Sequence, residues 1–213
     1  MPGRNIIKNY DDNGFYHIYN RGVEKREIFL DDQDYHVFLS YLKLYLSPAD
    51  DLEKVSPSRK LKNYFGEIEL LCYCLMPNHY HMLIKQHTST SIIGFIRSVS
   101  TKYAMYFNKK YKRSGHLFQG VYRAVTIDSE SQLIHLSRYI HRNPDPTGLN
   151  PVGLIQYPYS SLMNYLEKIN QPWINYQEIL CLFSKISLHP YLSFLFETTD
   201  LFDVAPLLID YDD

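Results

Sequence analysis

Two histidines in the segment His79-Tyr80-His81 are the first residues whose types and spacing indicate chemistry. The surrounding residues are typical of a β-strand, where residues i and i+2 project from the same face, so the two imidazoles should lie side by side. Two neutral imidazoles can bind one divalent cation and leave other coordination positions open, as a catalytic metal site requires. Taken alone, such a pair more often consists of structural histidines.

A second group of polar side chains recurs at four-residue spacing between Ser131 and Asn143. In a helix, His135, Tyr139 and Asn143 share one face, with Arg142 beside them. A tyrosine hydroxyl has a pKa of about 10, so it needs an activator or a well-placed electrophile to act as a nucleophile. A phosphodiester polarised by a metal would be that electrophile, with the Asn143 amide oxygen as a third ligand. The alternative is an ordinary amphipathic helix with Tyr139 at its border, which the abundance of tyrosine, 20 in 213 residues, favours.

The elements that must position these residues follow a regular order. Four strands are predicted from β-branched and aromatic runs bounded by turn residues, at 15–20, 68–75, 79–85 and 121–127. Three helices are predicted from apolar residues at helical spacing. The first begins at Asp31 or Asp32 and ends before Pro48, and the second begins near Ser89 or Ser91 and runs towards Tyr111. The third begins at Asp128 or Ser129 and ends before Pro144. The order β-α-β-β-α-β-α predicts an α+β fold, a ferredoxin-like (split βαβ) antiparallel sheet with an added helix carrying Tyr139.

Charge is divided unevenly along the chain. The formal net charge is −1, but residues 70–127 contain eight Lys and Arg and no Asp or Glu, which leaves 14 basic and 23 acidic residues elsewhere. The window therefore carries +8 and the remainder −9. Such a separation favours a surface that faces a polyanion, although a solvated basic helix face would give the same pattern.

Composition excludes several other classes of protein. An apolar fraction of 45% and a charged fraction of 21% exclude wholesale disorder. Three cysteines do not make a disulfide framework, and no run approaches the roughly 20 apolar residues that a membrane helix needs. A soluble cytoplasmic protein without a membrane partner is expected.

Four sequence blocks together resemble a known family. They are FYHIYNRG at 15–22, CLMPNHYHML at 74–83, SGHLFQG at 114–120 and RYIHRNP at 138–144. In this order they make residues 15–149 similar to the single-tyrosine HUH transposases of the IS200-like superfamily, most closely the bacterial REP-associated tyrosine transposases. The resemblance implies that His79 and His81 are metal ligands, Tyr139 is the nucleophile and Asn143 is the third ligand. It also implies DNA transposition, with cleavage and rejoining of single-stranded DNA through a 5′-phosphotyrosine.

The implied cofactor is a divalent metal, Mg²⁺ or Mn²⁺, because its other ligands would be phosphate oxygens. The implied partner is single-stranded or hairpin DNA, bound by a monomer or a homodimer. Candidate phosphate contacts are Arg97, Lys102, Lys109, Lys110, Lys112, Arg113, Arg123 and Arg142. Tyrosines interleaved with them offer faces on which unpaired bases stack, namely Tyr103, Tyr106, Tyr111 and Tyr122.

Two other functions stay open at this point. If Pro77-Asn78 is a two-residue turn, Cys72 and Cys74 share a face with the two histidines, and a closed Cys₂His₂ zinc site would make a zinc-stabilised binding protein. A domesticated DNA-binding protein could also keep the fold without transposing. We predict a catalytic domain over residues 1–150 and a small, mostly helical C-terminal extension with an acidic tail over residues 151–213.

Overall fold

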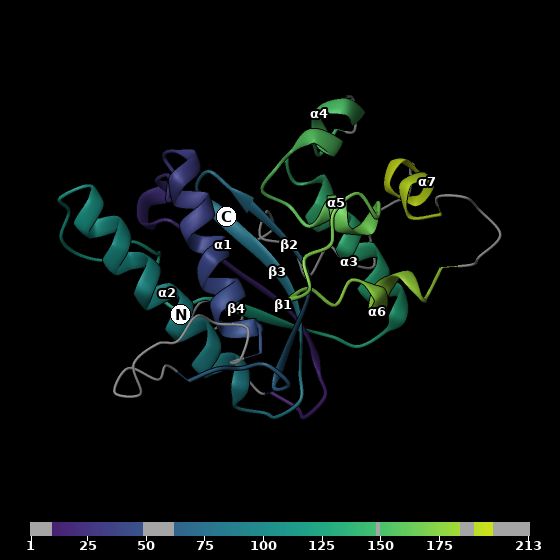
Figure 1. Cartoon of the computed structure of the whole chain (residues 1–213), viewed down its shortest axis with the longest axis horizontal. Helices are drawn as coiled ribbons and strands as arrows, with labels where there is room; N and C mark the ends of the chain where they lie inside the picture. Colours follow the sequence, from purple (N-terminus) through teal and green to yellow (C-terminus); the bar gives the residue numbers. More distant parts are fainter. Residues whose placement is uncertain (1–9, 49–61, 148–149, 184–189, 198–213) are drawn as a thin grey trace.

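The computed structural model describes residues 10–48, 62–147, 150–183 and 190–197 (Figure 1). The strands are β1 (Phe15–Arg21), β2 (Ile68–Met76), β3 (His79–Gln86) and β4 (Arg123–Ile127). The helices are η1 (Val23–Lys25, of 3-10 type), α1 (Asp32–Leu46), α2 (Ser91–Lys110), α3 (Glu130–Arg142), α4 (Pro151–Gln156), α5 (Leu162–Tyr165), α6 (Gln177–Leu180) and α7 (Pro190–Phe196). The predicted order of strands and helices is confirmed, and β4 begins two residues later than expected.

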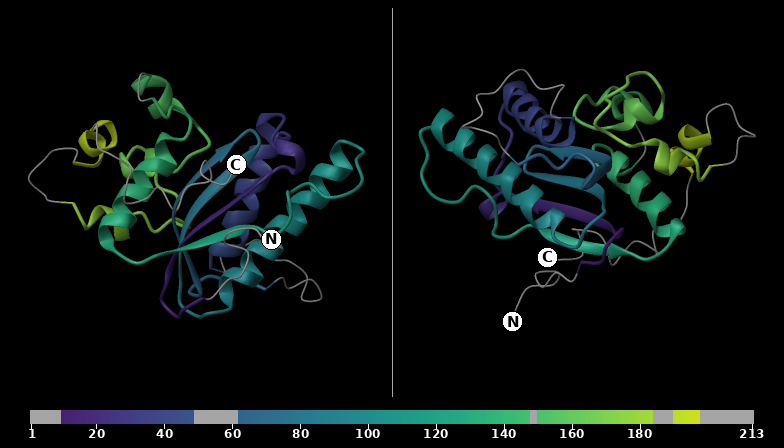
Figure 2. Two further views of the ribbon diagram at one scale, coloured as in Figure 1. Left: turned by 180° about the vertical axis from the view of Figure 1, so that it is seen from behind. Right: turned by 60° about the horizontal axis from the view of Figure 1, so that its bottom comes forward.

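The four strands form one antiparallel sheet in the order β2-β3-β1-β4. Helices α1 and α2 cover one face of the sheet, and α3 with the short helices α4 to α7 lies over the other (Figures 1 and 2). This arrangement is the predicted split βαβ fold with an added helix. The sheet therefore has two buried faces, which explains why β2 and β3 are buried at nearly every position.

Local signals account for where two of the helices begin. Asp31 caps α1, where its Oδ1 accepts a hydrogen bond from the backbone N–H of Asp34 at 3.1 Å. Ser129 caps α3, where its Oγ accepts from the N–H of Gln132 at 3.2 Å. The Gln132 side chain accepts a hydrogen bond from the N–H of Asp128 at 2.9 Å, which makes a capping box that closes one residue earlier than in its usual form.

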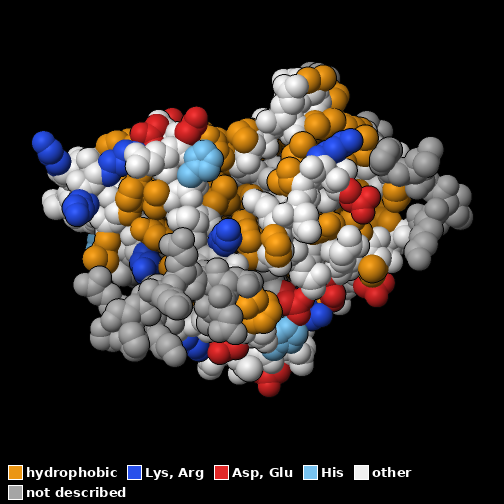
Figure 3. Space-filling view, viewed as in Figure 1, with side chains coloured by type: hydrophobic (Ala, Val, Ile, Leu, Met, Phe, Trp, Pro, Cys, Tyr) orange, Lys and Arg blue, Asp and Glu red, His pale blue; other side chains and the backbone are white. Residues whose placement is uncertain are grey.

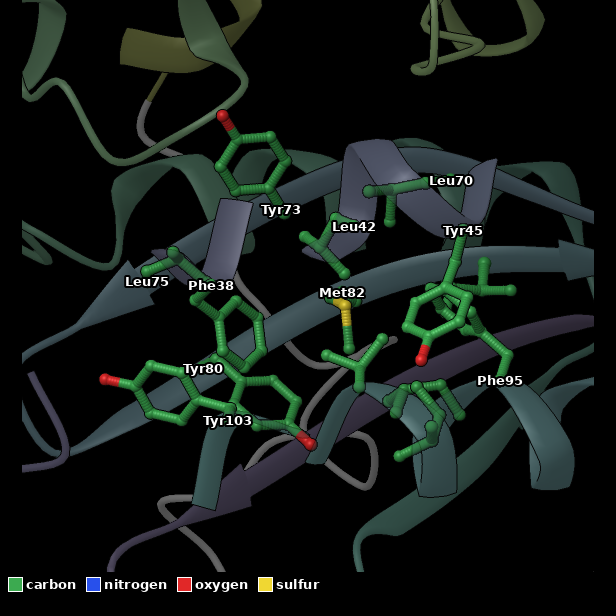
Figure 4. Close-up of a cluster of buried hydrophobic side chains, with 14 of the residues drawn as sticks. Phe38, Leu42, Tyr45, Leu70, Tyr73, Leu75, Tyr80, Met82, Phe95 and Tyr103 are labelled. Atoms are coloured by element: carbon green, nitrogen blue, oxygen red, sulfur yellow. The ribbon is translucent and has the colours of Figure 1, made fainter. Parts of the chain in front are cut away.

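The larger core lies between the sheet and helices α1 and α2 (Figure 4). Figure 4 labels side chains from both helices and from strands β2 and β3 that are 7% exposed or less: Phe38, Leu42, Tyr45, Leu70, Tyr73, Leu75, Tyr80, Met82, Phe95 and Tyr103. Burial of an apolar side chain of this size stabilises the fold by about 1.5–3 kcal/mol. This core holds the sheet rigid beneath the opposite face, which carries the candidate site.

The hairpin between β2 and β3 fixes the position of the two histidines. It turns at Pro77-Asn78, with Met76 opposite His79. The Pro77 carbonyl accepts hydrogen bonds from the N–H groups of Ile28 and Phe29, at 2.7 and 3.0 Å, which ties the turn to the loop after β1. His79 therefore begins β3 at the end of the sheet beside that loop.

The predicted acidic tail falls mainly outside the described residues. Within the described ranges, no helix combines the length and the apolar character needed to cross a membrane.

Candidate active site

Strand β3 and helix α3 bring the predicted chemical residues together. The rings of His79 and His81 lie 4.9 Å apart on the face of the sheet that α3 covers, with their planes at 87°. The Tyr139 ring lies 5.4 Å from that of His81, edge to face. Tyr139 is 9% exposed, so it borders solvent while it packs on the sheet. Residues separated by about sixty positions in sequence thus share one site.

His79 and Asn143 contact each other at hydrogen-bond distance. The Asn78 amide Nδ2 donates to the Lys25 carbonyl at 3.2 Å, so its Oδ1 is the atom that lies 2.6 Å from His79 Nδ1. His79 Nδ1 must then carry the proton, and Nε2 presents a lone pair. This Nε2 lies 3.0 Å from Asn143 Oδ1. The two atoms lie at hydrogen-bond distance, and a divalent cation bound there would take both as ligands.

His81 presents an unpaired nitrogen beside them. The residue is fully buried, and its Nε2 has no hydrogen-bond partner among the described residues. Burial lowers the pKa of His81 well below its ordinary value, and the neighbouring His79 and His17 lower it further, so the ring is neutral. Two imidazole nitrogens and an amide oxygen are a donor set that suits a divalent cation with open positions.

Strand β1 contributes residues that the sequence did not single out. His17 stacks on His81 with ring centroids 5.1 Å apart, and its Nε2 lies 2.9 Å from His81 Nδ1. Tyr19 pairs with His81 across the strands, and Arg21 pairs with His79. The available signal was the first of the four sequence blocks, FYHIYNRG, which contains these residues. Sequence alone does not say that β3 is the neighbour of β1.

Helix α3 is held in place by an apolar side and by one buried histidine. Its buried Leu133, Leu136 and Ile140 pack against β2 and β3. His141 Nδ1 lies 2.6 Å from the Tyr191 hydroxyl of α7, and its Nε2 lies 2.8 Å from Ser161 Oγ. Burial lowers the pKa of His141 to about 3, so the ring stays neutral at physiological pH. The C-terminal segment thus fixes the helix that carries Tyr139.

The predicted basic residues divide between the two sides of the molecule. Arg123 lies on β4 opposite Tyr19, on the face that holds the histidines, and Arg142 is in the last turn of α3. The other six lie on α2 or directly after it, on the opposite side of the sheet: Arg97, Lys102, Lys109, Lys110, Lys112 and Arg113. Figure 3 shows Lys and Arg side chains over the α2 side, at the left of the view. Only the first group adjoins the site.

Lys110 and Tyr103 are engaged in internal contacts. Lys110 Nζ donates to Asp31 Oδ1 at 2.7 Å and to Asp34 Oδ1 at 2.8 Å, so its charge is balanced within the protein. Tyr103 is fully buried and donates its hydroxyl hydrogen to the Ile28 carbonyl. The expectation that bases stack on Tyr103 is therefore wrong, because its ring lies in the core between α2 and the sheet.

The zinc alternative requires Cys72 and Cys74 to join the two histidines. The predicted register is confirmed, with Cys74 opposite His81. Burial raises the pKa of both thiols well above the ordinary value, and Cys74 Sγ donates to Met76 Sδ at 3.8 Å. Over the described part of the chain, no group of three or more His, Cys, Asp or Glu residues is arranged to hold a metal ion. The thiols are thus packed as protonated core groups.

Comparison with known proteins shows which protein family this chain resembles. Residues 55–143, which include both histidines, Tyr139 and Asn143, match the family model described as "Transposase IS200 like". The resemblance to the IS200-like transposases is confirmed. The match supports a transposase, an enzyme that acts on DNA. A search of curated proteins gave no match.

One solved structure supports the same fold. A REP-associated tyrosine transposase bound to a REP hairpin matches with a TM-score of 0.55 and 15% identity, over 78% of this chain and 87% of that one. A candidate transposase from Deinococcus radiodurans R1 gives a TM-score of 0.38 and 15% identity, over 67% and 96% of the two chains. The tRNA(His) guanylyltransferase of Saccharomyces cerevisiae gives 0.40 and 10% identity, over 97% and 85%. Only the first likeness is close enough to inform the fold.

Proposed function

We propose that the protein cleaves and rejoins single-stranded DNA beside a hairpin, through a covalent 5′-phosphotyrosine on Tyr139. In this proposal His79, His81 and Asn143 hold a divalent cation, Mg²⁺ or Mn²⁺. The solved transposase of the same fold is bound to a REP hairpin, which makes hairpin DNA the first substrate to test.

The observation that carries the proposal is a group of two imidazoles and one amide that converge beside the tyrosine. His79 Nε2 and Asn143 Oδ1 face each other at 3.0 Å, and the buried Nε2 of His81 has no partner among the described residues. A buried acceptor without a donor, such as His81 Nε2, costs free energy, and native proteins retain one where an ion or ligand satisfies it. The edge of the Tyr139 ring lies over His81, so the nucleophile would stand next to the bound phosphate.

The reaction follows from these residue types. When bound, the cation would polarise the scissile phosphate and orient it for in-line attack. The Tyr139 hydroxyl loses its proton, its oxygen bonds to phosphorus, and the bond from phosphorus to the 3′ oxygen breaks. The departing oxygen takes up a proton and becomes a free 3′-hydroxyl, while the 5′-phosphate stays on the tyrosine. A later 3′-hydroxyl can reverse the step without ATP, because the energy of the phosphodiester bond is retained.

Basic side chains on the same face of the sheet would bind the flanking phosphates. Arg21 lies opposite His79 and Arg123 lies opposite Tyr19, on the two strands beside the site. The loop that follows α2 adds an amide, since Arg21 Nε donates to Gln119 Oε1 at 2.5 Å. Arginine forks match phosphate geometry, and a DNA strand that crosses the sheet from the histidines on β3 toward β4 would meet Arg21 on β1 and then Arg123 on β4.

The test is incubation of the protein with single-stranded hairpin DNA and Mn²⁺, followed by a denaturing gel. Wild type should form a covalent adduct, Tyr139→Phe should form none, and Tyr41→Phe, a half-buried tyrosine of α1 on the other side of the sheet, should behave as wild type. An adduct formed by Tyr139→Phe would disprove the nucleophile assignment. Tight hairpin binding without any adduct would support a domesticated DNA-binding protein instead.

A further inference from the structure

We propose that His17 is a positioning residue for the metal site, which holds the proton of His81 on Nδ1 and thereby leaves His81 Nε2 free to bind the cation. The inference rests on the proposed function, because it takes His81 as a metal ligand. It assigns a task to a buried polar residue of β1 that the proposed reaction does not use.

The contact between the two histidines is close and enclosed. Both rings are fully buried, and they stack with centroids 5.1 Å apart and planes at 19°. His17 Nε2 lies 2.9 Å from His81 Nδ1, the distance of a hydrogen bond between nitrogens. The strands on which they stand are paired along their length, with His17 opposite Leu83 and Tyr19 opposite His81. The sheet itself therefore sets the distance between the rings.

Only one proton can lie between these two nitrogens, and the other contacts of the two rings determine which ring carries it. If His17 donated, His81 would carry its own proton on Nε2, the buried atom that has no partner among the described residues. A buried N–H donor without an acceptor is among the rarest groups in native proteins, whereas an unsatisfied acceptor is tolerated better. The proton therefore lies on His81 Nδ1 and is donated to His17 Nε2.

This arrangement prepares His81 as a ligand. A metal-binding histidine donates its other ring N–H to a partner, most often a carboxylate or a carbonyl, and loss of that partner costs about 10–100-fold in metal affinity or activity. Here a neutral imidazole takes the partner's place. For His79, by contrast, the partner is the Asn78 side-chain oxygen at 2.6 Å. Each proposed imidazole ligand thus has its own acceptor.

Binding of Mn²⁺ to the full-length protein, followed by electron paramagnetic resonance without DNA, tests the proposal. His17→Phe keeps a planar ring but has no acceptor, and it should weaken Mn²⁺ binding by about 10–100-fold. His17→Gln restores an acceptor oxygen and should recover most of that loss. Ile18→Ala serves as the matched control, because Ile18 is the next residue of β1 and is buried in the opposite core. It should lower the melting temperature and leave Mn²⁺ affinity unchanged.

A second measurement is independent of the metal and of activity. Nitrogen-15 NMR of histidine-labelled, metal-free wild type should show the His81 proton on Nδ1. In His17→Gln the proton should stay there, and in His17→Phe the Nε2 form should become populated. A wild-type proton on His81 Nε2 would overturn the inference even if either variant failed to fold.

The failures of the two proposals are distinguishable. Equal Mn²⁺ affinity in wild type and His17→Phe, or a His17→Gln protein as weak as His17→Phe, overturns the role of His17 and leaves the proposed reaction intact. A wild type that binds no Mn²⁺ and forms no adduct overturns both.

Discussion

Replacement of Lys110 by methionine tests whether this lysine, at the end of α2, binds DNA or stabilises the fold. Lys110 was expected to contact DNA, but its ammonium donates to Asp34, whose side chain is fully buried. Asp34 also accepts hydrogen bonds from the Tyr106 and Tyr111 hydroxyls and from the Leu30 N–H, at 2.9, 2.8 and 2.8 Å. Methionine keeps the packing of the side chain and removes only the charge.

The expected loss of stability comes from the Asp34 carboxylate, which stays buried without its cationic partner. Removal of one partner of a buried ion pair costs about 3–5 kcal/mol, because the other charge stays desolvated. Asp34 keeps three other donors, so we take the lower end, about 3 kcal/mol. For a protein of this size that corresponds to a melting temperature lower by about 6–12 °C. The neighbouring Lys109 is exposed, and Lys109→Met should change stability by no more than about 0.5 kcal/mol.

The pH dependence gives an independent check. In wild type, burial alone would raise the pKa of Asp34, but hydrogen bonds from Lys110, the Leu30 N–H and the two tyrosines outweigh it and hold the pKa below 3.8. Its stabilising contribution is therefore present above about pH 4 and is lost as the pH falls through the lowered value. In Lys110→Met the effect of burial dominates, so the pKa of Asp34 rises above its value in the unfolded chain. Protonation of Asp34 at low pH then removes the destabilisation.

The assay is thermal or urea denaturation of wild type and both variants between pH 7 and pH 3. The difference in stability between wild type and Lys110→Met should be largest at pH 7 and should begin to shrink above pH 4, as the pH falls through the raised pKa of Asp34 in the variant. Lys110→Met should also leave the salt dependence of hairpin binding as in wild type, since its charge is already balanced. Equal stability of the two lysine variants at pH 7, or a difference that does not change with pH, would refute the reasoning.

Three further predictions concern DNA binding beside the site, the contacts that hold α3, and the two buried cysteines. Arg123→Ala should weaken hairpin binding and reduce the slope of log affinity against log salt by about 0.7–0.9, as for one lost phosphate contact, whereas Arg97→Ala should have a smaller effect; the opposite order would place the DNA along α2. Tyr191→Phe leaves a buried histidine nitrogen unsatisfied and should cost about 1–3 kcal/mol in urea denaturation, and unchanged stability would contradict the proposed fixing of α3. A Cys72→Ala, Cys74→Ala double variant should purify without any loss of bound zinc relative to wild type, and stoichiometric zinc lost together with folding would revive the zinc-stabilised alternative.

Much of the fold could be predicted because the signals are local. The apolar spacing of α1 and α3, the caps at Asp31 and Ser129, and the turn at Pro77-Asn78 all depend on residues within a few positions of each other. The same holds for the pairing of His79 and His81, because two residues apart on a strand always share a face.

The sequence by itself determined which residues share an element and a face: the two histidines on one strand, and Tyr139 with Asn143 on one helix. The tertiary structure alone decided which elements meet. It brought His17 against His81, and it neutralised Lys110 while its neighbour Lys109 stayed in solvent. The physical reason is that spacing along a strand or helix fixes only relative direction. Contacts between elements depend on strand order, register and the burial of distant side chains, which no single segment encodes.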